Sequence, residues 1–265
     1  MAWSEVHWKS EILGKETTVQ VLTPQVGAPP YPTLYLLHSL NDDSYAWLRK
    51  TRIESLVRQL PLVVVMPDGY RGFFTDNEEG PPYARHVGEE VVSFVERTFP
   101  VRSERRSRAI GGVSMGGYGA LRVGLGYSDR FCSIHSHSGS LDRSVEFLLN
   151  PADRTGIMKH RPDRFIIEMR RIFGERPNGT KHDVLKLALD AKQRGTLPKL
   201  WIDCGTDDYL IEGTRAFHRE LEAAQIPHIY HEFPGSHDWE YANQHIEAAL
   251  AFHVANLEIV SIPTN

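Results

Sequence analysis

Three separate stretches of the chain carry the side chains that nucleophilic catalysis requires. Residues 112–116 read Gly-Val-Ser-Met-Gly, which fits the pattern G-x-S-x-G and places the Ser114 hydroxyl between glycines. Further along, Asp207 and Asp208 offer two adjacent carboxylates, and His237 follows in the sequence Gly-Ser-His-Asp-Trp. A hydroxyl becomes a strong nucleophile when an imidazole takes its proton and an acid holds that imidazole in one tautomer. These residue types predict acyl transfer to Ser114 and then to water.

The pattern around Ser114 lies where it has physical meaning. An apolar strand-like segment precedes it and a helix-like segment follows, so the serine is expected in a tight turn between strand and helix. A Cβ atom at position 112 or 116 would collide across that turn, which accounts for the glycines. Along the chain, Ser114, the carboxylates at Asp207 and Asp208, and His237 follow the order Ser, Asp, His of the α/β-hydrolase fold. The alternative interpretation is a glycine-rich turn without chemistry.

The oxyanion of such a reaction needs hydrogen-bond donors. The N–H of Met115, next to the serine, is the first candidate, and Ser39 or Leu40, after the apolar segment 33–37, is expected to supply the second. His38 is expected to order this loop by hydrogen bonds rather than to act as the base. Three aromatic residues near predicted strand ends either line a pocket or cover the core: Trp47, Phe73 and Phe74.

Alternating strand-like and helix-like segments predict the framework that positions these residues. Strands are predicted at residues 33–37, 62–66, 108–113, 131–136, 199–204 and 228–233, after an N-terminal antiparallel hairpin at 6–12 and 17–22. Helical spacing predicts helices over 45–60, 83–98 and 239–254, and one directly after Ser114. We therefore expect residues 1–265 to form one α/β domain with a mostly parallel central sheet and helices on both faces.

One long segment departs from this alternation. Between about residues 140 and 198, helical periodicity is interrupted by prolines and glycines. This pattern predicts a helical excursion from the sheet, placed as a cap near the active site.

Composition and charge narrow the classes of partner. The chain has 265 residues, 41% hydrophobic and 24% charged, which is typical of a folded globular protein. Its net charge of −4 argues against a phosphate-backbone partner, so no nucleic acid is expected. No run reaches the roughly eighteen apolar residues that cross a bilayer, so no membrane partner is expected. The N-terminus lacks the pattern of a secretory signal, which predicts a cytoplasmic location, with a removed leader as the alternative.

The cysteines and two neighbouring histidines have plain structural interpretations. Cys132 and Cys204 lie in apolar strand-like segments and are too few for a disulfide framework or a four-thiolate site, so we expect reduced core residues. His135 and His137 share one face of a strand, but no evident third ligand accompanies them. Neither a metal site nor a cofactor is expected.

The chain resembles the esterase D-like branch of the α/β-hydrolases, also called the "putative esterase" family. This family includes short-chain carboxylesterases, S-formylglutathione hydrolases, feruloyl esterases and mycolyltransferases. The resemblance covers nearly the whole length, through residues 34–38, 65–69, 74–76, 109–121, 204–208 and 235–239. It implies a catalytic triad of Ser114 as nucleophile, Asp208 as orienting acid and His237 as base. It also implies that the backbone N–H groups of Leu40 and Met115 form the oxyanion hole.

Two positions depart from the family pattern. Ser39 stands where the family usually has glycine, which puts the loop conformation and the identity of the second donor in question. Ala242 stands where the family often has a second aromatic residue. A wider pocket, or one filled by Tyr241, is expected there.

The resulting hypothesis is a serine esterase that cleaves short-chain carboxylic esters through an acyl-enzyme intermediate, with a small-molecule ester as its substrate. Two enzyme alternatives use the same chemistry: an S-formylglutathione hydrolase, which cleaves a thioester, and a carbohydrate acetyl or feruloyl esterase. The alternative outside enzymes is a catalytically silent hydrolase-fold binding module. The oligomeric state is left open, with a homodimer as one option.

Overall fold

An eight-stranded sheet runs through the protein in the order β1-β2-β4-β3-β5-β6-β7-β8. The computed structural model describes residues 1–142, 146–257 and 259. The strands are β1 (Ala2–Ser10), β2 (Lys15–Thr23), β3 (Thr33–Leu37), β4 (Val63–Pro67), β5 (Arg108–Val113), β6 (Ser133–His137), β7 (Lys199–Gly205) and β8 (Ile229–Phe233). Pairing is antiparallel from β1 through β2 to β4 and parallel from β4 to β8. The predicted mostly parallel sheet with an N-terminal antiparallel hairpin is confirmed.

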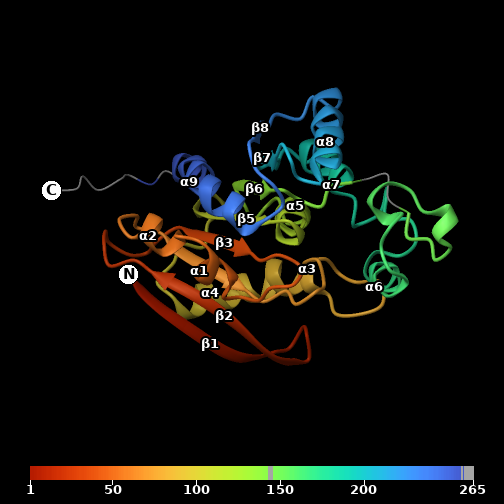
Figure 1. The fold of residues 1–265 in the computed structure, drawn as a ribbon. Coiled ribbons are helices and arrows are strands. Elements are labelled where there is room, and N and C mark those ends of the chain that lie inside the picture. The colour runs from red at the N-terminus through yellow and green to blue at the C-terminus, as the bar shows by residue number, and fades with distance from the viewer. Residues whose placement is uncertain (143–145, 258, 260–265) are drawn as a thin grey trace.

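Helices cover both faces of this sheet (Figure 1). One face packs against α1 (Ala46–Lys50), α2 (Ile53–Val57) and α9 (Trp239–Asn256), and the other against α5 (Met115–Gly126), α7 (Val184–Gln193) and α8 (Ile211–Ala223). Strand β3 shows the cause, because its side chains alternate between two cores. Leu34 and Leu36 enter one core, and Tyr35 and Leu37 enter the other.

The helix predicted over residues 45–60 is wrong as a single element, because α1 and α2 are separated at Thr51. The Thr51 hydroxyl donates to the carbonyl oxygen of Trp47 at 2.6 Å and accepts from the N–H of Ile53 at 3.2 Å. A threonine side chain that bonds the backbone in this way competes with helix continuation. The hydrophobic spacing alone did not reveal the break.

The helix predicted over residues 83–98 is present, with one irregular turn. It consists of α3 (Tyr83–Arg85), a π-helical turn η1 (His86–Val91) and α4 (Val92–Thr98). Helix α8 was not among the predicted elements, although its buried residues recur at helical spacing: Ile211, Thr214, Phe217 and Leu221. Both deviations leave the layer order unchanged.

The predicted helical excursion is confirmed in its described part, and its residues 143–145 lie outside the described residues. It contains the short 3₁₀ turns η3 (Pro151–Asp153) and η4 (Gly156–Met158), then α6 (Asp163–Phe173) and α7. Figure 1 shows α6 and its loops beside the sheet rather than on one of its faces. Arg71, in the loop after β4, holds α6 with a two-pronged ion pair to Glu168 at 2.6 and 2.7 Å. The excursion is therefore tied to the loops that follow the strands.

The two cysteines differ in their surroundings. Both thiols are free, but Cys204 is buried in β7 whereas Cys132 is partly exposed just before β6. Burial raises the pKa of the Cys204 thiol to about 12, which keeps it protonated. The prediction of a reduced core residue is confirmed for Cys204, whereas Cys132 is a free thiol that packs against the core and is only partly buried.

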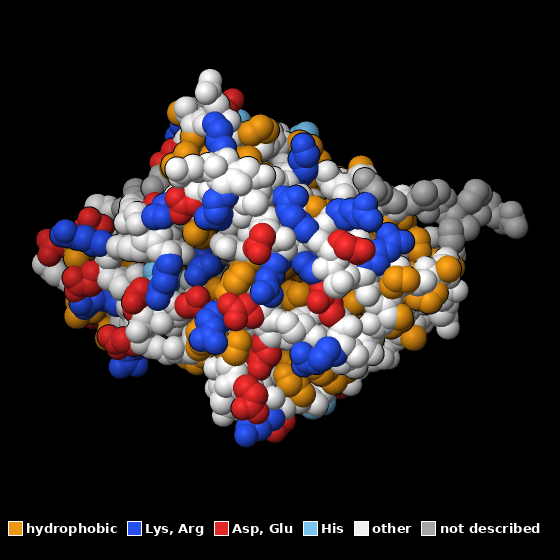
Figure 2. All heavy atoms as spheres, turned by 180° about the vertical axis from the view of Figure 1, so that it is seen from behind, with side chains coloured by type: hydrophobic (Ala, Val, Ile, Leu, Met, Phe, Trp, Pro, Cys, Tyr) orange, Lys and Arg blue, Asp and Glu red, His pale blue; other side chains and the backbone are white. Residues whose placement is uncertain are grey.

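The surface mixes charges of both signs. Figure 2 shows Lys and Arg side chains interspersed with Asp and Glu over the face that it presents. No helix among the described residues combines the length and apolar character needed to span a membrane.

Candidate active site

Ser114 lies in the turn between β5 and α5, with φ 58° and ψ −117°. Only residues with special support adopt a positive φ, which costs a non-glycine residue about 1–3 kcal/mol. The glycines on either side create the room for this turn. A Cβ atom on Gly112 would overlap the carbonyl oxygen of Gly116, and one on Gly116 would overlap that of Leu37. The collision predicted for both positions is confirmed.

Backbone hydrogen bonds hold this turn against the neighbouring strand and helix. The N–H of Ser114 donates to the carbonyl oxygen of His137 in β6 at 2.9 Å. The carbonyl oxygen of Ser114 accepts from the N–H of Tyr118 at 3.0 Å. The Ser114 side chain is therefore presented by a turn fixed at both ends.

Ser114, His237 and Asp208 form one continuous hydrogen-bonded chain. Ser114 Oγ lies 2.8 Å from His237 Nε2, and His237 Nδ1 lies 2.8 Å from Asp208 Oδ2. An ionised carboxylate can only accept, so His237 Nδ1 carries the proton and Nε2 of the neutral ring accepts from the serine hydroxyl. The three residues come from the ends of β5, β7 and β8, as the sequence predicted. Their catalytic roles stay predictions.

The carboxyl of Asp208 is kept ionised in a buried place. Burial alone would raise its pKa, but the hydrogen bond and charge of His237, with the N–H of Leu210 at 2.8 Å, outweigh this effect and lower the pKa. Asp207, by contrast, is exposed. Tyr209, the residue after Asp208, is 55% exposed, and its ring centroid lies 4.5 Å from that of His237.

Two other nearby carboxylates, those of Asp203 and Asp238, form hydrogen bonds with groups other than His237. Asp203 is fully buried and accepts from His137 Nδ1 at 2.7 Å, Trp201 Nε1 at 2.6 Å and the Tyr241 hydroxyl at 2.8 Å. Asp238 caps α9 by accepting from the N–H of Tyr241 at 2.9 Å. Neither side chain is bonded to His237.

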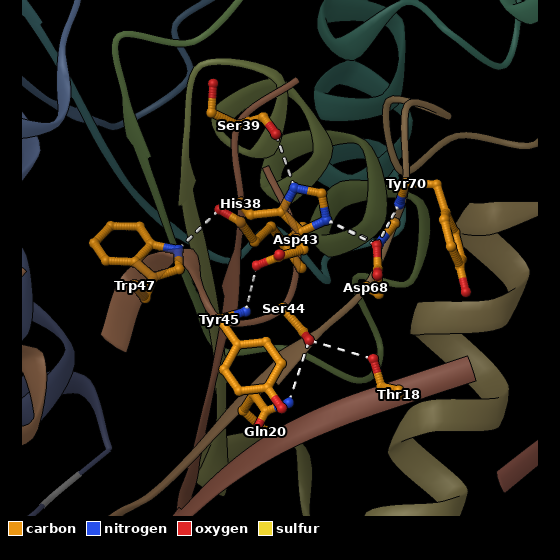
Figure 3. Close-up of polar contacts among 12 residues, drawn as sticks. Thr18, Gln20, His38, Ser39, Asp43, Ser44, Tyr45, Trp47, Asp68 and Tyr70 are labelled. Carbon is orange, nitrogen blue, oxygen red and sulfur yellow. Dashed lines mark hydrogen bonds and ion pairs between the residues drawn. The ribbon is translucent and has the colours of Figure 1, made fainter. Parts of the chain in front are cut away.

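His38 orders the loop after β3, as expected, and Figure 3 shows its contacts. Its Nε2 accepts from the N–H of Gly69 at 3.0 Å, so its Nδ1 carries the proton and donates to the carbonyl oxygen of Ser39 at 2.8 Å. The indole N–H of Trp47 donates to the carbonyl oxygen of Leu37 at 3.0 Å. These bonds fix the backbone as it leaves β3.

The backbone of this loop can offer a donor toward Ser114. Ser39 is not among the residues with positive φ, so a serine replaces the family's glycine without backbone strain. Its carbonyl faces His38, and in a trans peptide the N–H points opposite to the carbonyl, so the N–H of Leu40 points away from His38. Within the described residues, the N–H of Leu40 donates to no acceptor, and the N–H of Met115, the first residue of α5, donates to none outside that helix.

A cavity of about 240 Å³ opens beside Ser114 and His237. Both candidate oxyanion residues, Leu40 and Met115, line it, together with Ser39. Its wall is mostly apolar and comes largely from the excursion, including Phe147, Ile157, Met158, Phe165, Met169 and Phe173. The excursion therefore builds the pocket, as a cap near the active site would.

The three aromatic residues left open by the sequence divide between pocket and core. Phe73 lines the cavity, whereas Phe74 and Trp47 are fully buried. The expected change of pocket width at position 242 is wrong, because Ala242 is buried in the core formed with α1 and α2. Tyr241 is also buried and contacts Asp203 rather than the cavity.

The histidines of β6 belong to a buried polar network. His135 Nδ1 lies 2.7 Å from His253 Nε2, and His253 Nδ1 lies 2.8 Å from the Ser133 hydroxyl. Burial, reinforced by the nearby imidazole of His137, lowers the pKa of His253 to about 3 and that of His135 well below its usual value. Both rings are therefore neutral. Among the described residues, no cluster of three or more His, Cys, Asp or Glu could hold a metal ion.

A family model described as "Putative esterase" matches residues 10–253. The chain belongs to the "putative esterase" family. An acetyl esterase of Caldicellulosiruptor saccharolyticus is 32% identical to it, over 94% of this chain and 97% of that relative. The resemblance inferred from the motifs is therefore confirmed, and so is the class of enzyme, a carboxylic ester hydrolase.

Solved structures of this esterase's relatives agree. The fluorophosphonate-binding serine hydrolase F of Staphylococcus aureus, with substrate bound, has a TM-score of 0.81 and 27% identity, covering 96% of this chain and 98% of that one. An S-formylglutathione hydrolase of Staphylococcus aureus has a TM-score of 0.79 and 27% identity, with the same coverage. The α/β-hydrolase fold is confirmed, and the binding-module alternative is not supported.

Among the pocket residues that the sequence analysis did not identify, two lie at functionally important places. Tyr209 covers the ring of His237, and Arg161 lines the cavity from the loop before α6. The sequence did contain a signal for Tyr209, because a residue that directly follows Asp208 must lie close to the histidine that Asp208 binds. Arg161 gave no such signal, because the path of the excursion brings it to the site.

Proposed function

We propose that this esterase hydrolyses short-chain carboxylic esters through an acyl-enzyme on Ser114. The observation that carries the proposal is the unbroken chain from Ser114 Oγ to His237 to the buried Asp208, at 2.8 Å in each step, beside a small cavity. No cofactor is needed for this reaction.

The first half of the reaction transfers the acyl group to the enzyme. His237 Nε2 takes the proton of Ser114 as Oγ attacks the ester carbonyl, and Asp208 stabilises the resulting imidazolium. The N–H groups of Leu40 and Met115 stabilise the negative oxygen of the tetrahedral intermediate. His237 then gives the proton to the leaving alcohol as the carbon–oxygen bond breaks.

Water completes the cycle through the same groups. His237 takes a proton from water, the hydroxide attacks the acyl carbon, and the proton returns to Ser114 as the acid departs. The direction of the Leu40 N–H, opposite to the Ser39 carbonyl that His38 holds, supports Leu40 as the second donor.

Cavity size supports a small acyl group. About 240 Å³ lies below the 300–1,000 Å³ typical of sites for drug-sized ligands. We therefore expect acetate and butyrate esters of p-nitrophenol to be hydrolysed faster than octanoate. Clear activation at a lipid interface, or a preference for chains beyond about eight carbons, would contradict a pocket of this size.

A labelling experiment tests the nucleophile. A fluorophosphonate probe should add one adduct to the wild-type protein, mapped to Ser114 by peptide mass spectrometry, and none to Ser114→Ala. The alanine variant should lose on the order of 10⁴- to 10⁶-fold in kcat while remaining folded. Labelling of another residue, or an active alanine variant, would refute the proposal.

Thioester hydrolysis is the second candidate, favoured by the similarity to the Staphylococcus aureus S-formylglutathione hydrolase. A panel of p-nitrophenyl acetate, S-formylglutathione and methyl ferulate separates the three substrate classes. We expect the highest kcat/KM on the acetate, because the acetyl esterase relative covers nearly the full length of both chains. A larger kcat/KM on the thioester would favour the second candidate. The single domain, the cytoplasmic location and the oligomeric state stay predictions.

A further inference from the structure

Arg161 is the one lysine or arginine among the described residues that line the active-site cavity. It lies between η4 and α6, and it is partly exposed. The same cavity holds Ser114 and His237. A cation such as Arg161 in a mostly apolar pocket is a strong determinant of which substrates bind there.

Two aromatic rings pack against the guanidinium of Arg161. Its central carbon lies 5.2 Å from the ring centroid of Phe165 and 5.6 Å from that of Tyr209. Within the described residues, it makes no side-chain hydrogen bond or ion pair. Nearby Arg154 differs, because it donates to three backbone carbonyls and pairs with Asp163. Packing against aromatic rings orients a guanidinium while leaving its N–H donors for a planar anion.

The position of Tyr209 connects Arg161 to one side of the reaction. The ring centroid of Tyr209 lies 4.5 Å from that of His237 and 5.6 Å from the central guanidinium carbon of Arg161, so Tyr209 is next to both. In the proposed mechanism, His237 protonates the leaving group, so the leaving group must lie next to this imidazole. A leaving group that extends from His237 along Tyr209 therefore reaches Arg161.

Two acidic residues also line the cavity, and they limit what Arg161 can bind. Asp183 is engaged as the cap of α7, where it accepts from the N–H groups of Leu185 and Lys186. Asp142 lies against Gly213 of α8. An anion is therefore expected to bind at the Phe165 and Tyr209 rings, where the positive charge lies, rather than throughout the cavity.

We propose that this esterase prefers substrates whose leaving group carries a carboxylate, and that Arg161 binds this carboxylate. The inference rests on the proposed function, since it assigns the leaving-group side from His237. Arg161 acts as a specificity-determining residue and takes no part in bond making or breaking. Its contribution is expected mainly in KM.

A matched pair of esters tests the proposal. The substrates are 4-acetoxybenzoate, which carries a carboxylate, and its neutral methyl ester, which presents the same acetyl group. Arg161→Gln should lower kcat/KM for the carboxylate substrate by about tenfold or more relative to the methyl ester, and Arg161→Glu should lower it further. Comparing each variant with the wild type cancels the different intrinsic reactivities of the two esters. Arg161→Lys, which keeps the charge, should retain part of the preference.

Arg164→Gln is the control, because Arg164 lies close by in the chain, in the first turn of α6, and lines a different hollow. Its ratio of kcat/KM values should equal that of the wild type. An unchanged ratio in Arg161→Gln, or an equal loss on both esters, would overturn the role of Arg161. Failure of the proposed function looks different: the wild type would then hydrolyse neither ester, and fluorophosphonate would leave Ser114 unlabelled.

Discussion

Trp239 donates its indole N–H to the carboxylate of Asp42 across 3.0 Å. This bond joins two loops that serve the reaction in different ways. Trp239 begins α9 two residues after His237, and Asp42 lies two residues after Leu40. The Trp239–Asp42 bond therefore fixes the loop of the base, His237, relative to the loop of the proposed oxyanion donor, Leu40, without involving either residue directly.

Removing this bond should reduce turnover without abolishing it. Trp239→Phe keeps a ring against Trp47, whose centroid lies 5.2 Å away, and removes only the N–H donor. We expect kcat on p-nitrophenyl acetate to fall about three- to tenfold, as the loss of roughly 1 kcal/mol implies, with KM within about twofold. Trp3→Phe is the control, because its indole donates to Gln20 on the strand β2. Equal kcat in all three proteins would show that the bond is dispensable.

His38 should matter for the same reason, through the peptide that follows it. Its Nδ1–H holds the Ser39 carbonyl, and this sets the direction of the Leu40 N–H. His38→Ala should lower kcat about ten- to a hundredfold with little change in KM, because the oxyanion forms only after substrate has bound. His38→Asn, which offers a shorter amide donor, should recover part of the loss. A change confined to KM would contradict this positioning role.

The sequence predicted the elements whose residues interact locally. Strands β3 and β5 begin and end where the sequence indicated, because continuous apolar runs are bounded by turn residues. The turn at Ser114 follows from Gly112 and Gly116, whose Cβ atoms would overlap backbone oxygens. Steric constraints of this kind depend on a few residues that are close in the sequence, so they can be predicted from it.

Features that depend on tertiary placement were not predictable in the same way. The break between α1 and α2 at Thr51 depends on a hydrogen bond from the Thr51 hydroxyl to the carbonyl oxygen of Trp47. Ala242 faces a core rather than the pocket because of how α9 packs on α1 and α2. Arg161 reaches the cavity through a long excursion whose path no periodicity describes.

Acid should destabilise the fold through its buried histidines. Burial lowers the pKa of His182 to about 4 and that of His253 to about 3, against about 6.5 in an unfolded chain. As the pH falls below about 6.5, the unfolded chain binds protons that these folded rings do not. The contribution of these histidines to the free energy of unfolding is therefore fully present above that pH. It is lost as the pH falls toward 4, by about 1.4 kcal/mol per pH unit for each fully titrating ring.

Urea unfolding at pH 7.5 and pH 5.0 measures this loss. The free energy of unfolding should be lower at pH 5.0, and His182→Gln should show a smaller difference between the two pH values than the wild type. His160→Gln is the control, because His160 is exposed and its removal should leave the difference unchanged. Equal stability of the wild type at both pH values would contradict the assignment of neutral buried histidines.

The adjacent carboxylates Asp207 and Asp208 should differ sharply in their effect on turnover. Asp208 is buried and lies 2.8 Å from His237 Nδ1. Asp207 is exposed: its carboxylate accepts from the hydroxyl of Thr206, and its backbone N–H donates to the carbonyl oxygen of Gly235 in the loop after β8. Asp208→Asn should therefore cost about 10³- to 10⁴-fold in kcat, because the imidazole loses the acceptor that fixes its tautomer. Asp207→Asn should change kcat by less than about tenfold. Both variants are measured on p-nitrophenyl acetate, with circular dichroism to compare their folding. A severe loss in Asp207→Asn, or mild effects in both, would show that His237 takes its orientation from another group.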